Sequence, residues 1–124
     1  MLQLDLQSRQ PIYEQLIHKI SELASLGALG PDSQLPSVRT LARELGVNPN
    51  TVQKAYQELE RCGIIYSVGG KGSFIAPGNT AAEMLAGQSL GKIRDAVREG
   101  KRIGLTHTQV DTVVNEVFDE EGSR

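Results

Sequence analysis

One stretch near the middle of the chain carries amide side chains that could hydrogen-bond to the edges of nucleic-acid bases. Polar residues recur there at the spacing i, i+3, i+4 and i+7, which puts them on one side of a helix: Asn50, Gln53, Lys54 and Gln57. The apolar residues fall on the opposite side: Val52, Ala55, Tyr56 and Leu59. A carboxamide can donate to and accept from adenine at once in the major groove. The pattern predicts a recognition helix in which Asn50 and Gln53 contact bases. The alternative is an ordinary solvated polar face.

Cationic side chains lie on either side of this stretch. Arg39 and Arg43 are four residues apart and therefore share a helix face. Arg39 falls in a first helical turn, where the helix dipole disfavours a cation, so its position suggests an anionic partner. Ser37 and the free N–H groups beside it could bind a phosphate. For Arg43, the alternative is an exposed ion pair with a neighbour such as Glu44.

Lys71 lies between two glycines, Gly70 and Gly72, which would let its charge and backbone approach a phosphate closely. An ordinary hairpin turn would be equally rich in glycine. Between residues 36 and 75, five basic and three acidic side chains give a net charge of +2, and the rest of the chain carries −4. The overall charge of −2 argues against non-specific coating of nucleic acid but leaves room for a local basic surface.

Helix start and stop signals predict the elements that position these residues. A first helix should begin at Pro11 and stop near Gly27. Ser37 should cap a second helix that ends at Gly46, and Asn48 should cap a third helix that begins at Pro49 and ends at Gly63. Because only three residues separate the second helix from the third, the pair predicts a helix-turn-helix.

The residues that follow predict a β-hairpin. Segments 64–68 and 73–76 favour strands, and the glycine-rich segment 69–72 favours a turn between them. A hairpin directly after a helix-turn-helix is a wing. We therefore expect a mainly α fold with a small β-hairpin, in which residues 1–77 form a winged helix-turn-helix domain.

Residues 78–124 predict a helical hairpin. Capping-box spacing occurs at Thr80–Glu83 and at Thr106–Gln109. Two helices cannot enclose a core alone, so their apolar positions should pair with a second copy of the chain: Leu90, Ile93, Val97, Val113, Val117 and Phe118. Such a homodimer would place two recognition helices about one DNA turn apart, or a multiple of it. The alternative is that these helices pack on their own winged domain.

Several classes of protein are disfavoured. The sequence contains no nucleophile–base pair or phosphate loop, so we expect no catalytic residue and no enzyme. One cysteine, Cys62, and two distant histidines, His18 and His107, predict no metal site and no cofactor. No apolar run could span a membrane and no signal sequence is evident, which predicts a cytoplasmic protein without a membrane partner. The sequence leaves a small-molecule effector unassigned, although so short a tail has little room for a large ligand pocket.

The segment LPSVRTLARELGVNPNTVQKAYQELE, residues 35–60, resembles the DNA-binding domain of GntR-family bacterial transcription regulators. Pro11–Leu16 upstream and Gly70–Ile75 downstream match the same family, so the resemblance covers residues 10–76. The short two-helix tail resembles the YtrA-like subfamily, whose members often control transporter operons and dimerise through that tail. The resemblance implies a dimeric repressor that binds an inverted repeat in double-stranded DNA. A winged-helix module for protein–protein assembly is the competing interpretation.

The resemblance also implies particular DNA contacts. The family's contacting arginine after the Pro-Ser pair corresponds to Arg39, and its wing-tip glycine and basic residue correspond to Gly70 and Lys71. Contacting residues at the start of the recognition helix correspond to Asn48, Asn50 and Thr51. Many members carry arginine where this chain has Pro49 and Gln53, so the operator of another member does not transfer. We expect amide-to-adenine contacts and a half-site that contains A·T pairs.

Overall fold

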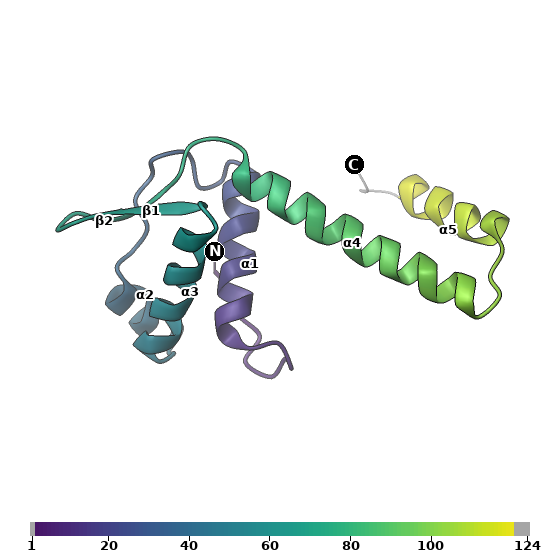
Figure 1. The fold of residues 1–124 in the computed structure, drawn as a ribbon. Coiled ribbons are helices and arrows are strands. Elements are labelled where there is room, and N and C mark those ends of the chain that lie inside the picture. The colour runs from purple at the N-terminus through teal and green to yellow at the C-terminus, as the bar shows by residue number, and fades with distance from the viewer. Residues whose placement is uncertain (1, 121–124) are drawn as a thin grey trace. The chain divides into compact units, whose positions relative to one another are not determined.

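The computed structural model describes residues 2–120, which form five helices and one two-stranded hairpin (Figure 1). The elements follow the chain in this order: α1 (Ile12–Ser25), α2 (Val38–Leu45), α3 (Pro49–Arg61), β1 (Ile65–Val68), β2 (Gly72–Ile75), α4 (Thr80–Arg102) and α5 (His107–Asp119). The strands pair antiparallel, with Tyr66 opposite Phe74 and Val68 opposite Gly72. The predicted mainly α fold, with a winged helix-turn-helix and two C-terminal helices, is confirmed.

The two helices of the helix-turn-helix are capped by the residues that the sequence predicts. The Thr40 N–H donates to Ser37 Oγ at 3.1 Å, which caps α2. Gly46 ends α2 with φ of 70°, a left-handed conformation that glycine adopts without strain. The Asn50 N–H donates to Asn48 Oδ1 at 2.8 Å, and Pro49 occupies the first position of α3. Local hydrogen bonds and the left-handed Gly46 therefore fix where α2 ends and where α3 begins.

The C-terminal helices match the prediction at one of the two expected capping boxes. In α5 the Thr106 box is complete, because the Gln109 N–H donates to Thr106 Oγ1 and the Thr106 N–H donates to Gln109 Oε1. At α4 the helix already includes Thr80, and the Glu83 N–H donates to the Asn79 carbonyl at 2.9 Å. The prediction that Thr80 precedes this helix as its cap is wrong by one residue.

Gly100 lies inside α4, close to the C-terminal end of that helix. A methyl group at this position would lie 2.9 Å from Leu105 Cδ1. The missing side chain therefore makes room for Leu105 where the chain turns from α4 toward α5.

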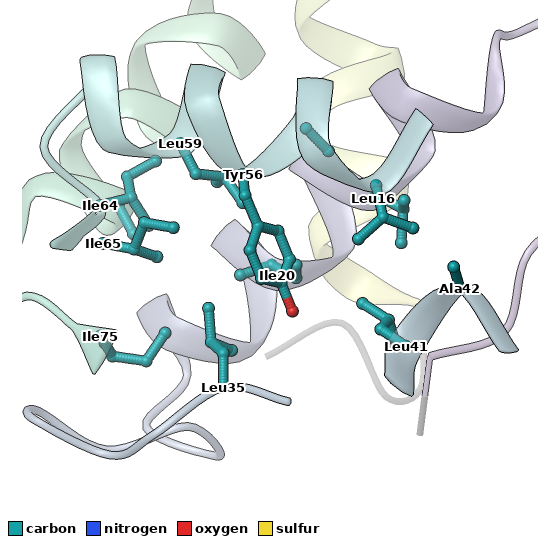
Figure 2. Close-up of a cluster of buried hydrophobic side chains, with 13 residues drawn as sticks. Leu16, Ile20, Leu35, Leu41, Ala42, Tyr56, Leu59, Ile64, Ile65 and Ile75 are labelled. Atoms are coloured by element: carbon teal, nitrogen blue, oxygen red, sulfur yellow. The ribbon is translucent and has the colours of Figure 1, made fainter. Parts of the chain in front are cut away.

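A single aliphatic core holds the N-terminal part together (Figure 2). Helix α3 packs against α1 and α2 and reaches β1. Among the described residues, thirteen buried hydrophobic side chains form this cluster: Leu16, Ile20, Leu35, Leu41, Ala42, Val52, Ala55, Tyr56, Leu59, Ile64, Ile65, Ile75 and Ala81. Cys62 is half-buried and packs against this cluster.

Tyr56 is the one aromatic residue of this buried cluster (Figure 2). Its hydroxyl donates to the Pro36 carbonyl at 2.7 Å, just before α2 begins. Burial, and after it the nearby charge of Glu44, raises the pKa of Tyr56 to about 12. The phenol thus stays protonated and bonded across the neutral range.

The chain divides into two compact units, the first of which runs to Leu85 while the second begins at Ala86. Ala81 is buried in the first unit and Met84 packs against its core, so the start of α4 belongs with the winged domain. The predicted domain boundary between residues 77 and 78 stays a prediction. Within residues 2–120, none of the helices combines the length and apolar character that a bilayer span requires.

Replacing Tyr56 with phenylalanine tests the bond between α3 and the start of α2. We expect Tyr56→Phe to lower the free energy of unfolding at pH 7 by about 1 kcal/mol, because the Pro36 carbonyl loses its donor. Urea unfolding followed by circular dichroism measures this loss. Tyr13→Phe is the control, since its hydroxyl contacts Glu14 at 3.4 Å at an exposed site.

The same variant has a pH signature. The pKa of Tyr56 is higher in the folded chain than the value of 10.0 typical of an exposed phenol, so its contribution is complete below pH 10 and is lost as the pH rises toward 12. Tyr56→Phe should therefore lose less stability than the wild type between pH 10 and 12. An equal loss in the two proteins would contradict the assignment.

Candidate nucleic-acid interface

Helix α3 exposes the side that the sequence predicts to face DNA. Its polar residues are exposed: Asn50, Gln53, Lys54 and Gln57. On the opposite side Val52 and Leu59 are 0% exposed. The core therefore uses one side of α3 completely, and the amide-bearing side stays open to a ligand. That Asn50 and Gln53 contact bases stays a prediction.

Helix α2 adds two arginines without nearby counter-charges. Arg39 and Arg43 are exposed. Among residues 2–120, no carboxylate lies within 4.0 Å of either guanidinium, so the alternative ion pair between Arg43 and Glu44 does not form. The two arginines differ in this respect from Arg61 at the end of α3. Arg61 donates to Glu58 at 3.0 Å and lowers the pKa of that carboxyl.

Three predicted contact residues already have structural roles. Ser37 Oγ accepts from the Thr40 N–H and donates to Thr40 Oγ1 at 2.9 Å. Asn48 Oδ1 caps α3, and the half-buried Thr51 donates its N–H to the Asn48 carbonyl at 3.0 Å. The exposed amide of Asn48 keeps its N–H donors for a ligand. These residues hold the helix-turn-helix in shape, and their contact with DNA stays a prediction.

Sequence reasoning missed the partner of Lys54. The Lys54 Nζ lies 3.8 Å from the centroid of the Tyr13 ring, which α1 supplies. A cation over an aromatic face is attracted to the ring. Tyr13 therefore restrains the Lys54 ammonium group on the exposed side of α3, which also carries the amides. The two residues are 41 positions apart in the sequence, and no local pattern could have paired them.

The hairpin presents Lys71 at its exposed tip. Gly70 and Gly72 have φ of 76° and 114°, which explains why glycine flanks this lysine on both sides. Farther down the hairpin the rings of Tyr66 and Phe74 stack at a centroid distance of 5.5 Å. The Tyr66 hydroxyl donates to Asp32 Oδ1 at 2.7 Å, and this bond raises the pKa of Tyr66. The wing is thereby tied to the segment that precedes α2.

The second unit leaves large apolar side chains exposed. All six residues predicted for a dimer interface are among them: Leu90, Ile93, Val97, Val113, Val117 and Phe118. Leu90 is 56% exposed and Phe118 is 75% exposed. Exposed apolar side chains in such number on two helices indicate a surface that binds a partner. Pairing with a second copy stays a prediction.

Comparison with known proteins agrees with this geometry. Residues 12–75 match the family described as bacterial regulatory proteins, gntR family. The HTH-type transcriptional repressor YtrA of Bacillus subtilis (strain 168) is 51% identical over 76 residues, which is 61% of this chain and 58% of YtrA. The match therefore spans a little over half of that relative.

Two solved structures extend the comparison. A transcriptional regulator from Oenococcus oeni superimposes with a TM-score of 0.77 at 32% identity, over 95% of this chain and 99% of that one. The DNA-binding domain of AraR in complex with operator ORE1 superimposes with a TM-score of 0.52 at 33% identity, over 61% of this chain and 93% of that one.

Arg39 provides the most direct test of the interface. We expect Arg39→Ala to reduce the affinity for a duplex enriched from a random pool at least tenfold, because an exposed cation without a counter-charge is lost. The melting temperature should not change, since the Arg39 side chain is exposed. Arg98→Ala is the matched control. It removes the same charge from an exposed site outside the stretch that matches the family. Equal affinities of Arg39→Ala and the wild type would contradict the assignment.

Proposed function

The chain belongs to the gntR family of bacterial regulatory proteins and is a DNA-binding transcription regulator, and we propose that it represses transcription as a homodimer bound to an inverted-repeat operator. The observation that carries this proposal is the division of α3 into a fully buried apolar side and an exposed amide side. The two exposed arginines of α2 also support it, because among the described residues no carboxylate lies within 4.0 Å of either one.

The proposed contacts fall into two classes. Asn50 and Gln53 read adenines in the major groove, so each half-site contains A·T pairs. Phosphates are bound by the start of α2, by Lys54 and by the wing tip, through these residues: Ser37, Arg39, Arg43, Lys54, Gly70 and Lys71. Asn48 and Thr51 contact DNA where α3 enters the groove. Because most of these contacts are to phosphates, affinity should fall steeply with salt.

Dimerisation accounts for the exposed apolar side chains of α4 and α5 and for an operator that is an inverted repeat. In the proposed dimer, α4 and α5 of each chain bury their exposed apolar side chains against the partner. A two-fold axis between the chains presents two α3 helices in opposite directions, which matches an inverted repeat. The protein then acts in the cytoplasm by occupying DNA rather than by catalysis.

Selection of bound duplexes from a random pool, at a stated salt concentration, tests the whole proposal. We expect an inverted repeat whose half-sites contain A·T pairs and whose centres are separated by one helical turn or a multiple of it. If no duplex is enriched and the protein instead captures a partner protein without any dependence on DNA, the proposal is wrong and the chain is a protein-assembly module.

Leu90 tests the dimer. Leu90→Asp should convert the dimer to monomer at micromolar concentration and weaken operator binding at least tenfold, because burying an unpaired carboxylate against the partner is costly. Sedimentation velocity measures the first effect and a binding titration the second. Leu26→Asp makes the same change at a residue of the first unit that is 74% exposed. This control should remain dimeric. A dimeric Leu90→Asp protein would refute the predicted interface.

A further inference from the structure

The segment just before α2 forms a strap along the wing. We define the strap as residues 32–36. The Asp32 N–H donates to the Ile75 carbonyl at 2.7 Å, and the Ile75 N–H donates to the Ser33 carbonyl at 2.9 Å. The Leu35 N–H donates to the Ser73 carbonyl at 2.8 Å. The strap therefore runs beside β2 as a third, irregular strand.

Gln34 reaches from the strap to the tip of the wing. Its Nε2 donates to the Lys71 carbonyl at 2.7 Å, across 37 residues of sequence. Gly72 makes this approach possible, because a methyl group there would lie 3.0 Å from Gln34 Nε2. Gln34 itself is exposed, so its side chain adds little to the core. Among the described residues, the side-chain hydrogen bond of Gln34 is the one to the tip.

The bond from Gln34 completes the restraint on the Lys71 backbone. The Lys71 N–H donates to the Val68 carbonyl at 2.9 Å, and its carbonyl accepts from Gln34. Both polar backbone groups of Lys71 are therefore held, while its side chain remains exposed. A glycine-rich tip without such bonds would sample many conformations.

The other end of the strap leads directly into α2. The Pro36 carbonyl accepts from the Tyr56 hydroxyl of α3, and Ser37 caps the helix that carries Arg39. One short segment thus links the wing tip, the first turn of α2 and the core-facing side of α3.

We propose that Gln34 is a positioning residue for DNA binding, which fixes the wing tip so that Lys71 meets a phosphate at a set distance from Arg39. The inference rests on the proposed function and adds a residue that contacts no DNA itself. Ordering the tip before DNA arrives lowers the conformational entropy that binding would otherwise cost. Losing the bond should weaken operator binding about fivefold, which corresponds to one ordinary hydrogen bond.

The first test uses the free protein and does not depend on DNA. Gln34→Met keeps an unbranched side chain of similar length but removes the donor. We expect the heteronuclear ¹⁵N NOE values of Gly70, Lys71 and Gly72 to fall in this variant, while those of α1 and α3 and the melting temperature stay unchanged. Gln10→Met is the control at another exposed glutamine. Unchanged NOE values at the tip would overturn the proposal, and so would a loss of order throughout the first unit.

The second test is a double-mutant cycle on the selected operator. Gln34→Met should weaken binding about fivefold when Lys71 is present and should have a clearly smaller effect in the Lys71→Ala background, where the phosphate contact proposed for Gly70 is the one that remains at the tip. Lys71→Ala should also reduce the slope of log affinity against log salt by about one. Additive effects of the two changes would overturn the proposal, because Gln34 would then act independently of Lys71.

The two tests separate failure of this inference from failure of the proposed function. If the wild type enriches no duplex, the proposed function fails even where the tip loses order in Gln34→Met. If Arg39→Ala weakens operator binding but Lys71→Ala does not, the chain binds DNA without the Lys71 side chain, and the role of Gln34 in positioning Lys71 is refuted.

Discussion

The packing of α3 between its neighbours is the constraint on which the rest of the structure depends. Val52, Ala55, Tyr56 and Leu59 are buried, so the rotation of α3 about its axis cannot change without exposing them. Burial of four such side chains stabilises that rotation by several kcal/mol, on the order of 1–3 kcal/mol for each large side chain. The same rotation exposes Asn50, Gln53 and Gln57 together. The core therefore determines which residues α3 can offer to a ligand.

A second set of interactions fixes what surrounds α3. The Tyr56 hydroxyl binds the Pro36 carbonyl, the strap residues bind β2, and Gln34 binds the tip of the wing. Lys54 lies over the Tyr13 ring and is restrained in turn. These bonds therefore link the elements that carry the cations of α2, α3 and the wing within the free chain. Among the described residues, the second unit has no comparable core, and its large apolar side chains are exposed in a single copy of the chain.

The sequence predicted the elements well because their ends depend on short-range bonds. Ser37 and Thr40, Asn48 and Asn50, and Thr106 and Gln109 are each within three residues of one another, so their spacing can be read directly. The misplaced start of α4 shows the limit of such reasoning. Thr80 and Glu83 have capping-box spacing, but the helix begins at Thr80 itself, after Asn79.

The sequence by itself determined most of the helix limits, the two-sided character of α3 and the family, because each follows from residue types at fixed short spacings. Only the tertiary structure decided which distant residues meet. Tyr13 with Lys54, Tyr56 with Pro36 and Gln34 with Lys71 are separated by 20 residues or more, as is Tyr66 from Asp32. No periodicity encodes these pairs, because they depend on how the elements pack in space. The helix faces could thus be predicted, whereas the contacts between distant residues that position Lys54 and the Lys71 backbone had to be observed.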